Sequence, residues 1–199
     1  QLALNWKKSP TRYVVKNAKL FNSRRADFAP MFMGKDYTQL YFTSSNDKAS
    51  GDNKSEITGM KNCDVFVAKQ DENGVWQRPE LVEGELNSEF DEGITAFSPD
   101  GTTMYLAKAR RDPNASTSVE IYTSQRSEAQ WSAPVKLEIT GDTISAYGDP
   151  AVSTDGEWLY FVSDMPGGYG GKDIWRINLK ERVGSLENLG NVINTPGDE

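Results

Sequence analysis

The sequence predicts an all-β protein built as a β-propeller, and three observations support this. First, a set of sequence signals recurs in the same order, and the acids that mark it, Asp27, Asp91, Asp149 and Asp198, are 64, 58 and 49 residues apart. Second, each repeat contains short runs of β-branched and aromatic residues between turn residues. Third, no segment has a long 3.6-residue apolar period, so helices should be few and short. A repeat of about 50 residues with four short strands has the size of a propeller blade.

The first signal is a lead-in in which an apolar residue, Asn and Ser or Thr are followed by an acid. It occurs at 21–27, 86–91 and 193–198, with a degenerate copy at 144–149. We interpret the acids Asp27, Asp91, Asp149 and Asp198 as structural, because acids that recur in repeats usually accept backbone hydrogen bonds. The alternative is a ring of carboxylates near the propeller axis that holds a metal ion or a cationic peptide.

The second signal is a strand, a tight turn and another strand. Its turns are Asp100-Gly101 and Asp155-Gly156, and we assign them a structural role. Gly tolerates a positive φ and Asp accepts local backbone hydrogen bonds, which suits a tight hairpin. The runs 40–42 and 159–161, both Leu-Tyr-Phe, are apolar on both faces, as expected of a middle strand packed between neighbouring blades.

The third signal is an acid followed by a β-rich run, at 64–67, 120–123 and 173–176. Two copies continue with Trp-x-x-Pro, at 76–79 and 131–134. The fixed places of Trp76, Trp131, Trp158 and Trp175 in the repeat predict core packing between blades. The alternative for these aromatic residues is a sugar-binding face.

These signals divide the chain into a linker from a preceding region (1–11) and a propeller segment (12–199). The predicted blades are approximately 21–85, 86–143 and 144–192, and 193–199 starts the next blade. We expect 12–20 to form the outer strand of a further blade. Because propellers typically close with 4–8 blades, about three blades plus partial flanking strands predict a segment of a larger closed propeller. A β-sandwich would not explain the repeated order of the signals.

Composition excludes several classes of function. The net charge of −7 disfavours nucleic acid as a partner, because phosphate contacts need a basic surface. No apolar run is long enough for a transmembrane helix. The chain has no histidine, so neither a Ser-His-Asp triad nor a pair of His with its single cysteine, Cys63, can form. We therefore expect a protein that is not an enzyme, with no catalytic, cofactor-binding or metal-binding residues and no cofactor.

The glycine-rich loop 167–172 ends in a lysine, which suggests phosphate binding. It lacks the P-loop spacing, and a strand follows it instead of a helix that would offer its N-terminus to an anion. We expect a tight loop between two strands.

Three segments resemble a known family. The hairpin 98–106, the run 163–175 and the link 191–199 resemble the WD-like periplasmic β-propeller repeats of TolB and of OmpA-associated envelope proteins of Bacteroidetes. They also resemble the propellers of the type IX secretion system proteins PorW/SprE and PorE. The resemblance covers 12–199 and specifies fold more strongly than activity. The long polar insertion between Phe42 and Asp64 departs from the pattern, and we expect a protruding loop there.

The resemblance implies a non-catalytic scaffold of the cell envelope that contacts other envelope or secretion proteins within the type IX machinery. It implies a periplasmic lipoprotein associated with the outer membrane. One alternative is a peptidoglycan- or glycan-associated propeller of an OmpA-like protein, in which another domain contacts peptidoglycan. The other is a hydrolase or lyase acting on glycans or peptides.

Overall fold

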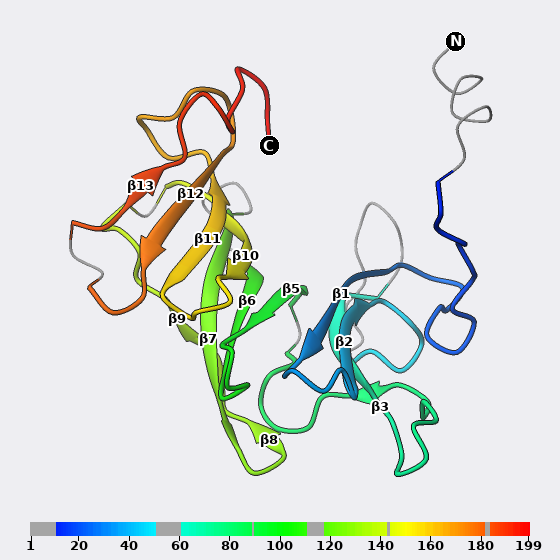
Figure 1. Ribbon diagram of the computed structural model, residues 1–199. Helices are drawn as coiled ribbons and strands as arrows, with labels where there is room; N and C mark the ends of the chain where they lie inside the picture. The colour runs from blue at the N-terminus through cyan, green and yellow to red at the C-terminus, as the bar shows by residue number, and fades with distance from the viewer. Residues whose placement is uncertain (1–10, 51–60, 89, 111–117, 143, 182–183) are drawn as a thin grey trace.

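The computed structural model of the chain describes residues 11–50, 61–88, 90–110, 118–142, 144–181 and 184–199. Within these residues the secondary structure consists of strands and turns, without a helix (Figure 1). The prediction of an all-β propeller segment is confirmed. The described part of the chain also contains no helix with the length and apolar character needed to cross a membrane.

The described strands form three antiparallel meanders, which correspond to blades. The first contains β1 (Asp27–Met33), β2 (Gln39–Ser44), β3 (Asp64–Lys69) and β4 (Glu80–Leu81). The second contains β5 (Glu92–Phe97), β6 (Thr103–Arg110), β7 (Ser118–Ser127), β8 (Gln130–Trp131) and β9 (Val135–Lys136), with β8 and β9 both paired to β7. The third contains β10 (Tyr147–Val152), β11 (Trp158–Ser163), β12 (Asp173–Asn178) and β13 (Glu187–Asn188).

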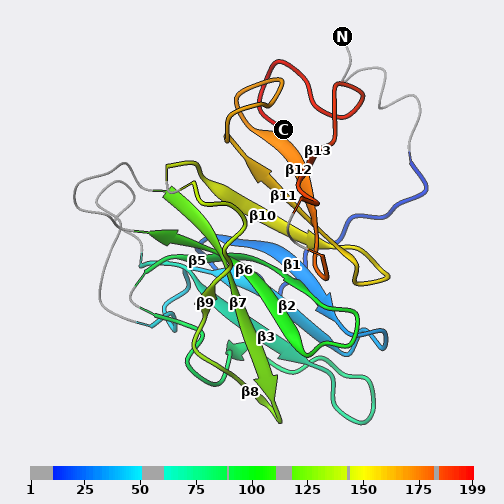
Figure 2. The ribbon, with the colours of Figure 1, turned by 90° about the vertical axis from the view of Figure 1, so that its left-hand side faces the viewer.

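The second sheet lies between the other two (Figure 1), and Figure 2 views the same arrangement from the side of the third sheet. The first strand of each blade is an edge strand, and β5 contacts both β1 and β10. The three first strands therefore lie next to one another on the inner side of the assembly, as expected around a propeller axis.

Two apolar clusters fill the junctions between blades. The first joins the first and second blades and consists of Met33, Tyr41, Val65, Val67, Val82, Leu86, Met104, Leu106 and Trp131. The second joins the second and third blades and consists of Ala96, Tyr105, Ile121, Leu137, Tyr147, Leu159, Phe161, Met165, Trp175 and Ile177. Successive residues of a strand point to opposite faces, which places Leu106 in the first cluster and Tyr105 in the second. This alternation explains why the middle strands are apolar on both faces.

Two tryptophans confirm the predicted core role, because Trp131 and Trp175 are 2 % and 7 % exposed. The indole of Trp131 also donates a hydrogen bond to the hydroxyl of Tyr41 at 3.3 Å. Trp76 and Trp158 are only half-buried. The sequence pattern therefore predicted the packing of two of the four correctly.

Each inner strand carries a bulge. The pairing register shifts between Phe28 and Met31 in β1, at the matching point of β10, and one residue earlier, between Glu92 and Thr95, in β5. Ala29 and Asp149 occupy equivalent bulge positions and have φ values of 53° and 50°. A bulge bends an edge strand and interrupts regular pairing, so it shapes the inner surface of the blades.

Two expectations concern segments outside the sheets. The residues 12–20, expected to be the outer strand of a further blade, are exposed and form no strand among the described residues. Their pairing with a further blade stays a prediction. The predicted loop between Phe42 and Asp64 lies partly outside the described residues, at 51–60. In its described part, Ala49 is buried against Phe42 and Phe66.

Candidate functional site

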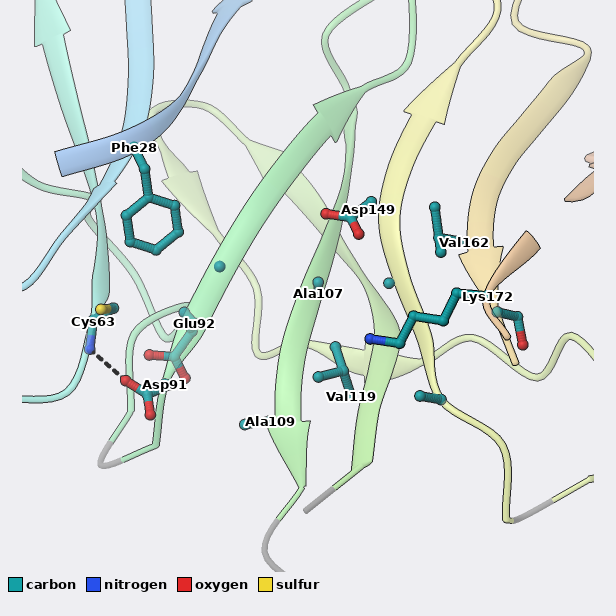
Figure 3. Close-up of a pocket in the computed structure, with 14 residues that line it drawn as sticks. Phe28, Cys63, Asp91, Glu92, Ala107, Ala109, Val119, Asp149, Val162 and Lys172 are labelled. Carbon is teal, nitrogen blue, oxygen red and sulfur yellow. Dashed lines mark hydrogen bonds between the residues drawn. The ribbon is translucent and has the colours of Figure 1, made fainter. Parts of the chain in front are cut away.

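A pocket of about 320 Å³ opens where the three blades meet along their inner strands (Figure 3). Its wall is mostly apolar and includes Phe28 from the first blade, Ala107 and Val119 from the second, and Val162 from the third. All three blades therefore contribute to one surface, although their lining residues are far apart in the sequence.

The strand register explains why the pocket is hollow. Phe28, Gly93 and Gly148 occupy equivalent positions on the three inner strands, so the second and third blades have glycine where the first has a large ring. A Cβ atom added to Gly148 would lie 3.8 Å from Val119 Cγ1, an ordinary contact. A side chain at Gly148 would therefore not clash with its neighbours. The space beside this glycine is part of the open volume of the pocket.

Several charged groups at the pocket are engaged within the protein. Asp91 accepts a hydrogen bond at 2.8 Å from the backbone N–H of Cys63 (Figure 3). Glu92 is fully buried, forms an ion pair with Lys108 at 2.9 Å and accepts a hydrogen bond from the Ser88 hydroxyl. Burial raises the pKa of Glu92, although Ser88 and Lys108 oppose this shift. The Asp91 bond joins the first two blades, while the Glu92 contacts lie within the second.

Cys63 lies on the same wall, and burial together with the neighbouring Asp91 raises the pKa of its thiol to about 11. A thiolate is the reactive form of cysteine, so at neutral pH this side chain is protonated and unreactive. The neighbouring Asp64 is buried as well, and burial raises the pKa of its carboxyl.

Asp149 and Lys172 are the remaining charged side chains of the pocket. Both are exposed, and neither side chain forms a hydrogen bond or an ion pair with another described residue. In Figure 3 both extend from the third blade toward the pocket. The pocket thus combines an apolar wall with one carboxylate and one ammonium that are available to a ligand.

The four lead-in acids occupy three different positions in the blades. Asp27 begins β1, and its equivalent in the second blade is Glu92. Asp91 and Asp198 occupy equivalent positions, because each accepts a backbone N–H from the residue before the third strand of a blade. These residues are Cys63, at 2.8 Å, and Lys172, at 2.9 Å. Asp149 lies at a bulge. Among the described residues, no three His, Cys, Asp or Glu side chains are placed to hold a metal ion.

Sequence reasoning missed the role of the lead-in asparagines. Asn87 accepts the backbone N–H of Val65 at 2.8 Å and donates to its carbonyl at 3.1 Å. Asn194 forms the same pair of bonds with Ile174, at 2.9 and 3.1 Å. The segments 87–88 with 90–92, and 194–199, here called the latches, therefore attach these two lead-ins to the third strand of the preceding blade. The recurrence of Asn in the lead-in was the signal that pointed to this role.

The predicted turn residues lie in the hairpins. Gly101 and Gly156 have φ values of 70° and 72°, which L-residues rarely adopt. Asp100 accepts the N–H of Thr102 at 3.0 Å, and Asp155 accepts that of Glu157 at 2.9 Å. Hydrogen bonds from the hydroxyls of Ser98 and Ser153, together with these backbone bonds, lower the pKa of Asp100 and Asp155.

The glycine-rich loop 167–172 packs against the second latch. A Cβ atom on Gly170 would lie 2.1 Å from the carbonyl oxygen of Gly197, so the close approach requires glycine. The backbone N–H groups of Tyr169 and Gly170 both donate to the carboxylate of Asp173. Two backbone donors of the loop are therefore occupied by an acid of the chain itself, which agrees with the interpretation of a tight loop.

The chain matches no protein-family model and no curated protein sequence. Among solved structures, it is similar to TolB from Acinetobacter baumannii, with a TM-score of 0.54 and 20 % identity over 85 % of this chain and 33 % of TolB. It is also similar to a puromycin-hydrolyzing peptidase of Mycobacterium tuberculosis, with a TM-score of 0.52 and 16 % identity over 83 % of this chain and 23 % of the peptidase. The chain spans a third or less of these proteins. At such identity the likeness concerns the fold, and the chain has the β-propeller fold found in TolB.

Proposed function

We propose that this protein is a non-catalytic interaction module of the bacterial cell envelope, which holds a partner protein at the pocket between its blades. The observation that carries the proposal is the pocket itself: three blades present one apolar wall with two uncommitted charges, Asp149 and Lys172. Surfaces that combine an apolar centre with a few polar groups are suited to recognition.

The chemistry of the pocket favours binding over reaction. Cys63, the thiol that lines it, has a pKa of about 11. Asp91 and Glu92 are engaged in hydrogen bonds and an ion pair. The absence of histidine removes the commonest general base of enzymes. These features support a protein that is not an enzyme.

Location and pathway belong to the same proposal. The likeness to TolB and the sequence resemblance to Bacteroidetes envelope propellers together support a periplasmic place, next to the outer membrane. The resemblance of 163–175 and 191–199 to the propellers of PorW/SprE and PorE supports a role in the type IX secretion machinery. Its partners are then other envelope or secretion proteins.

Comparative capture of partners from envelope extract tests the proposal. The immobilised protein is compared with Gly148→Leu, which fills the pocket, and with Gly141→Leu, because nothing lies within 4 Å of a Cβ atom at Gly141. We expect a defined envelope protein to bind the wild type and the Gly141 variant but not the Gly148 variant, with all three folded by circular dichroism. Turnover of an extract glycan or peptide, or equal capture by all three proteins, contradicts the proposal.

A further inference from the structure

We propose that the pocket binds a short peptide with both ends free, so that its ammonium group pairs with Asp149 and its carboxylate pairs with Lys172. This inference concerns the pocket named in the proposed function and goes beyond that function, because it assigns the pocket a free peptide as its ligand. It follows from four features of the described residues: the two uncommitted charges, the apolar wall, the open edges of the inner strands and the volume.

The charges set the first requirement for a ligand. Asp149 and Lys172 both line the pocket, yet they are not within 4.0 Å of each other as an ion pair, and neither has another described partner. A ligand with a single charge would satisfy one of them and leave the other without a partner. A ligand with a positive and a negative end complements both, and charge-assisted hydrogen bonds are stronger than neutral ones.

Asp149 is held in place by the backbone. It sits at the β10 bulge with a φ of 50°, and its equivalent in the first blade, Ala29, has no charge to offer. A bulge redirects the side chain of an edge strand, and Figure 3 shows the Asp149 carboxylate extending toward the pocket. Lys172 directly precedes β12, and the bond from its backbone N–H to Asp198 fixes its main chain. The two charges therefore come from anchored backbone positions.

The wall sets the second requirement. Besides the two charges, the lining includes Ala107, Val119, Val162 and the ring of Phe28. A sugar would place hydroxyl groups against these side chains without hydrogen-bond partners, which is unfavourable. Small aliphatic side chains, such as that of alanine, fit the wall without this cost.

The strand edges and the volume point to a peptide backbone. β5 and β10 are edge strands, and Gly93 and Gly148 leave their backbones uncovered at the pocket. Glycine in a strand permits close approach of another backbone, and an extended peptide can pair with an open strand edge. A volume of about 320 Å³ is at the small end of ligand pockets, whose range is roughly 300–1,000 Å³. This size suits two or three small residues.

Trialanine and its blocked forms test the inference. Binding to the protein is measured by NMR titration for free, N-acetylated, C-amidated and doubly blocked trialanine. We expect each single block to weaken binding about five- to tenfold, because each removes one charge-assisted hydrogen bond. We expect N-acetylation to have no further effect on Asp149→Asn, and C-amidation to have none on Lys172→Gln.

Glu72→Gln and Lys35→Gln are the matched controls. Both residues are exposed in hairpin turns, and neither side chain has a described partner. They should bind all four peptides as the wild type does. Equal binding of free and doubly blocked trialanine, or no binding at millimolar concentration, overturns the inference.

The outcomes separate this inference from the proposed function. If trialanine does not bind while the wild type still captures an envelope protein that Gly148→Leu releases, the inference fails and the scaffold stands. If trialanine binds with the expected charge dependence and no protein is captured, the inference stands and the scaffold fails. Retention of a glycan in the pocket in place of peptide overturns the inference as well.

Discussion

The latch at Asn87 offers a sharp test of how the blades are joined. The amide of this side chain replaces a strand neighbour for Val65: it accepts the N–H and donates to the carbonyl. Val65 is fully buried, so water cannot take over these bonds. In Asn87→Ala, the carbonyl of Val65 keeps the hydrogen bond from Val82, but its N–H loses its acceptor.

The magnitude follows from these contacts. A hydrogen bond contributes about 1 kcal/mol net, and a buried donor left unpaired costs about 1–3 kcal/mol. We therefore expect Asn87→Ala to lower the free energy of unfolding by about 2–4 kcal/mol. Asn22 occupies the same place in the first lead-in, but it is exposed, and within the described residues its side-chain amide donates to Asn17 alone. Asn22→Ala should cost less than about 0.5 kcal/mol.

Urea unfolding followed by tryptophan fluorescence measures both variants against the wild type. Trp131 in the core between the first two blades reports the state of this junction, because it is 2 % exposed. If Asn87→Ala and Asn22→Ala lower the free energy of unfolding equally, the reasoning about the latch is wrong. A loss below about 1 kcal/mol for Asn87→Ala, less than the lowest cost of an unpaired buried donor, refutes it too.

Three further predictions follow from particular contacts. Burial raises the pKa of Glu92 above its ordinary 4.5, so the folded state keeps this proton where the unfolded chain loses it; stability from this group falls as pH rises from 4.5 through the folded pKa. Glu92→Gln should remove that part of the pH dependence of the free energy of unfolding, measured in urea at pH values above 4.5, and an unchanged slope contradicts the prediction. Gly84 has a φ of 109°, and a Cβ atom added there would lie 2.2 Å from the Trp131 carbonyl oxygen. Gly84→Ala should therefore lower the free energy of unfolding by about 2–4 kcal/mol in thermal unfolding. The control, Gly74→Ala in an open turn, should lower it by about 1 kcal/mol. The thiol pKa of Cys63 is about 11 instead of 9.0, so alkylation by iodoacetamide at pH 8 should be about 100-fold slower in the folded protein than in urea. Equal rates would contradict the buried surroundings assigned to this thiol.

The sequence by itself determined the architecture and the turns, because these depend on local signals. The hairpin turns at Gly101 and Gly156 need a positive φ, which Asp-Gly provides within a few residues. The middle strands are apolar at successive positions because each packs between two neighbours, and this pattern is visible without knowing which neighbours they are. Repetition of these signals along the chain then predicted a propeller.

The register was not determined by the sequence. Spacing grouped Asp27 with Asp91, whereas pairing makes Glu92 the equivalent of Asp27. A shift of one residue exchanges the two faces of a strand, so this difference decides which acid is buried and which contacts the preceding blade. The bulge at Asp149 is a similar case, since an extra residue in an edge strand leaves no clear mark in the sequence pattern.

The pocket depended entirely on the tertiary structure. Its open space results from Gly93 and Gly148, which are small where Phe28 of the first blade is large, and these residues meet only when the blades assemble. The availability of Asp149 and Lys172 likewise depends on which partners the fold brings near them. Local chemistry therefore specified the blades, while the packing of blade against blade decided where a ligand can bind.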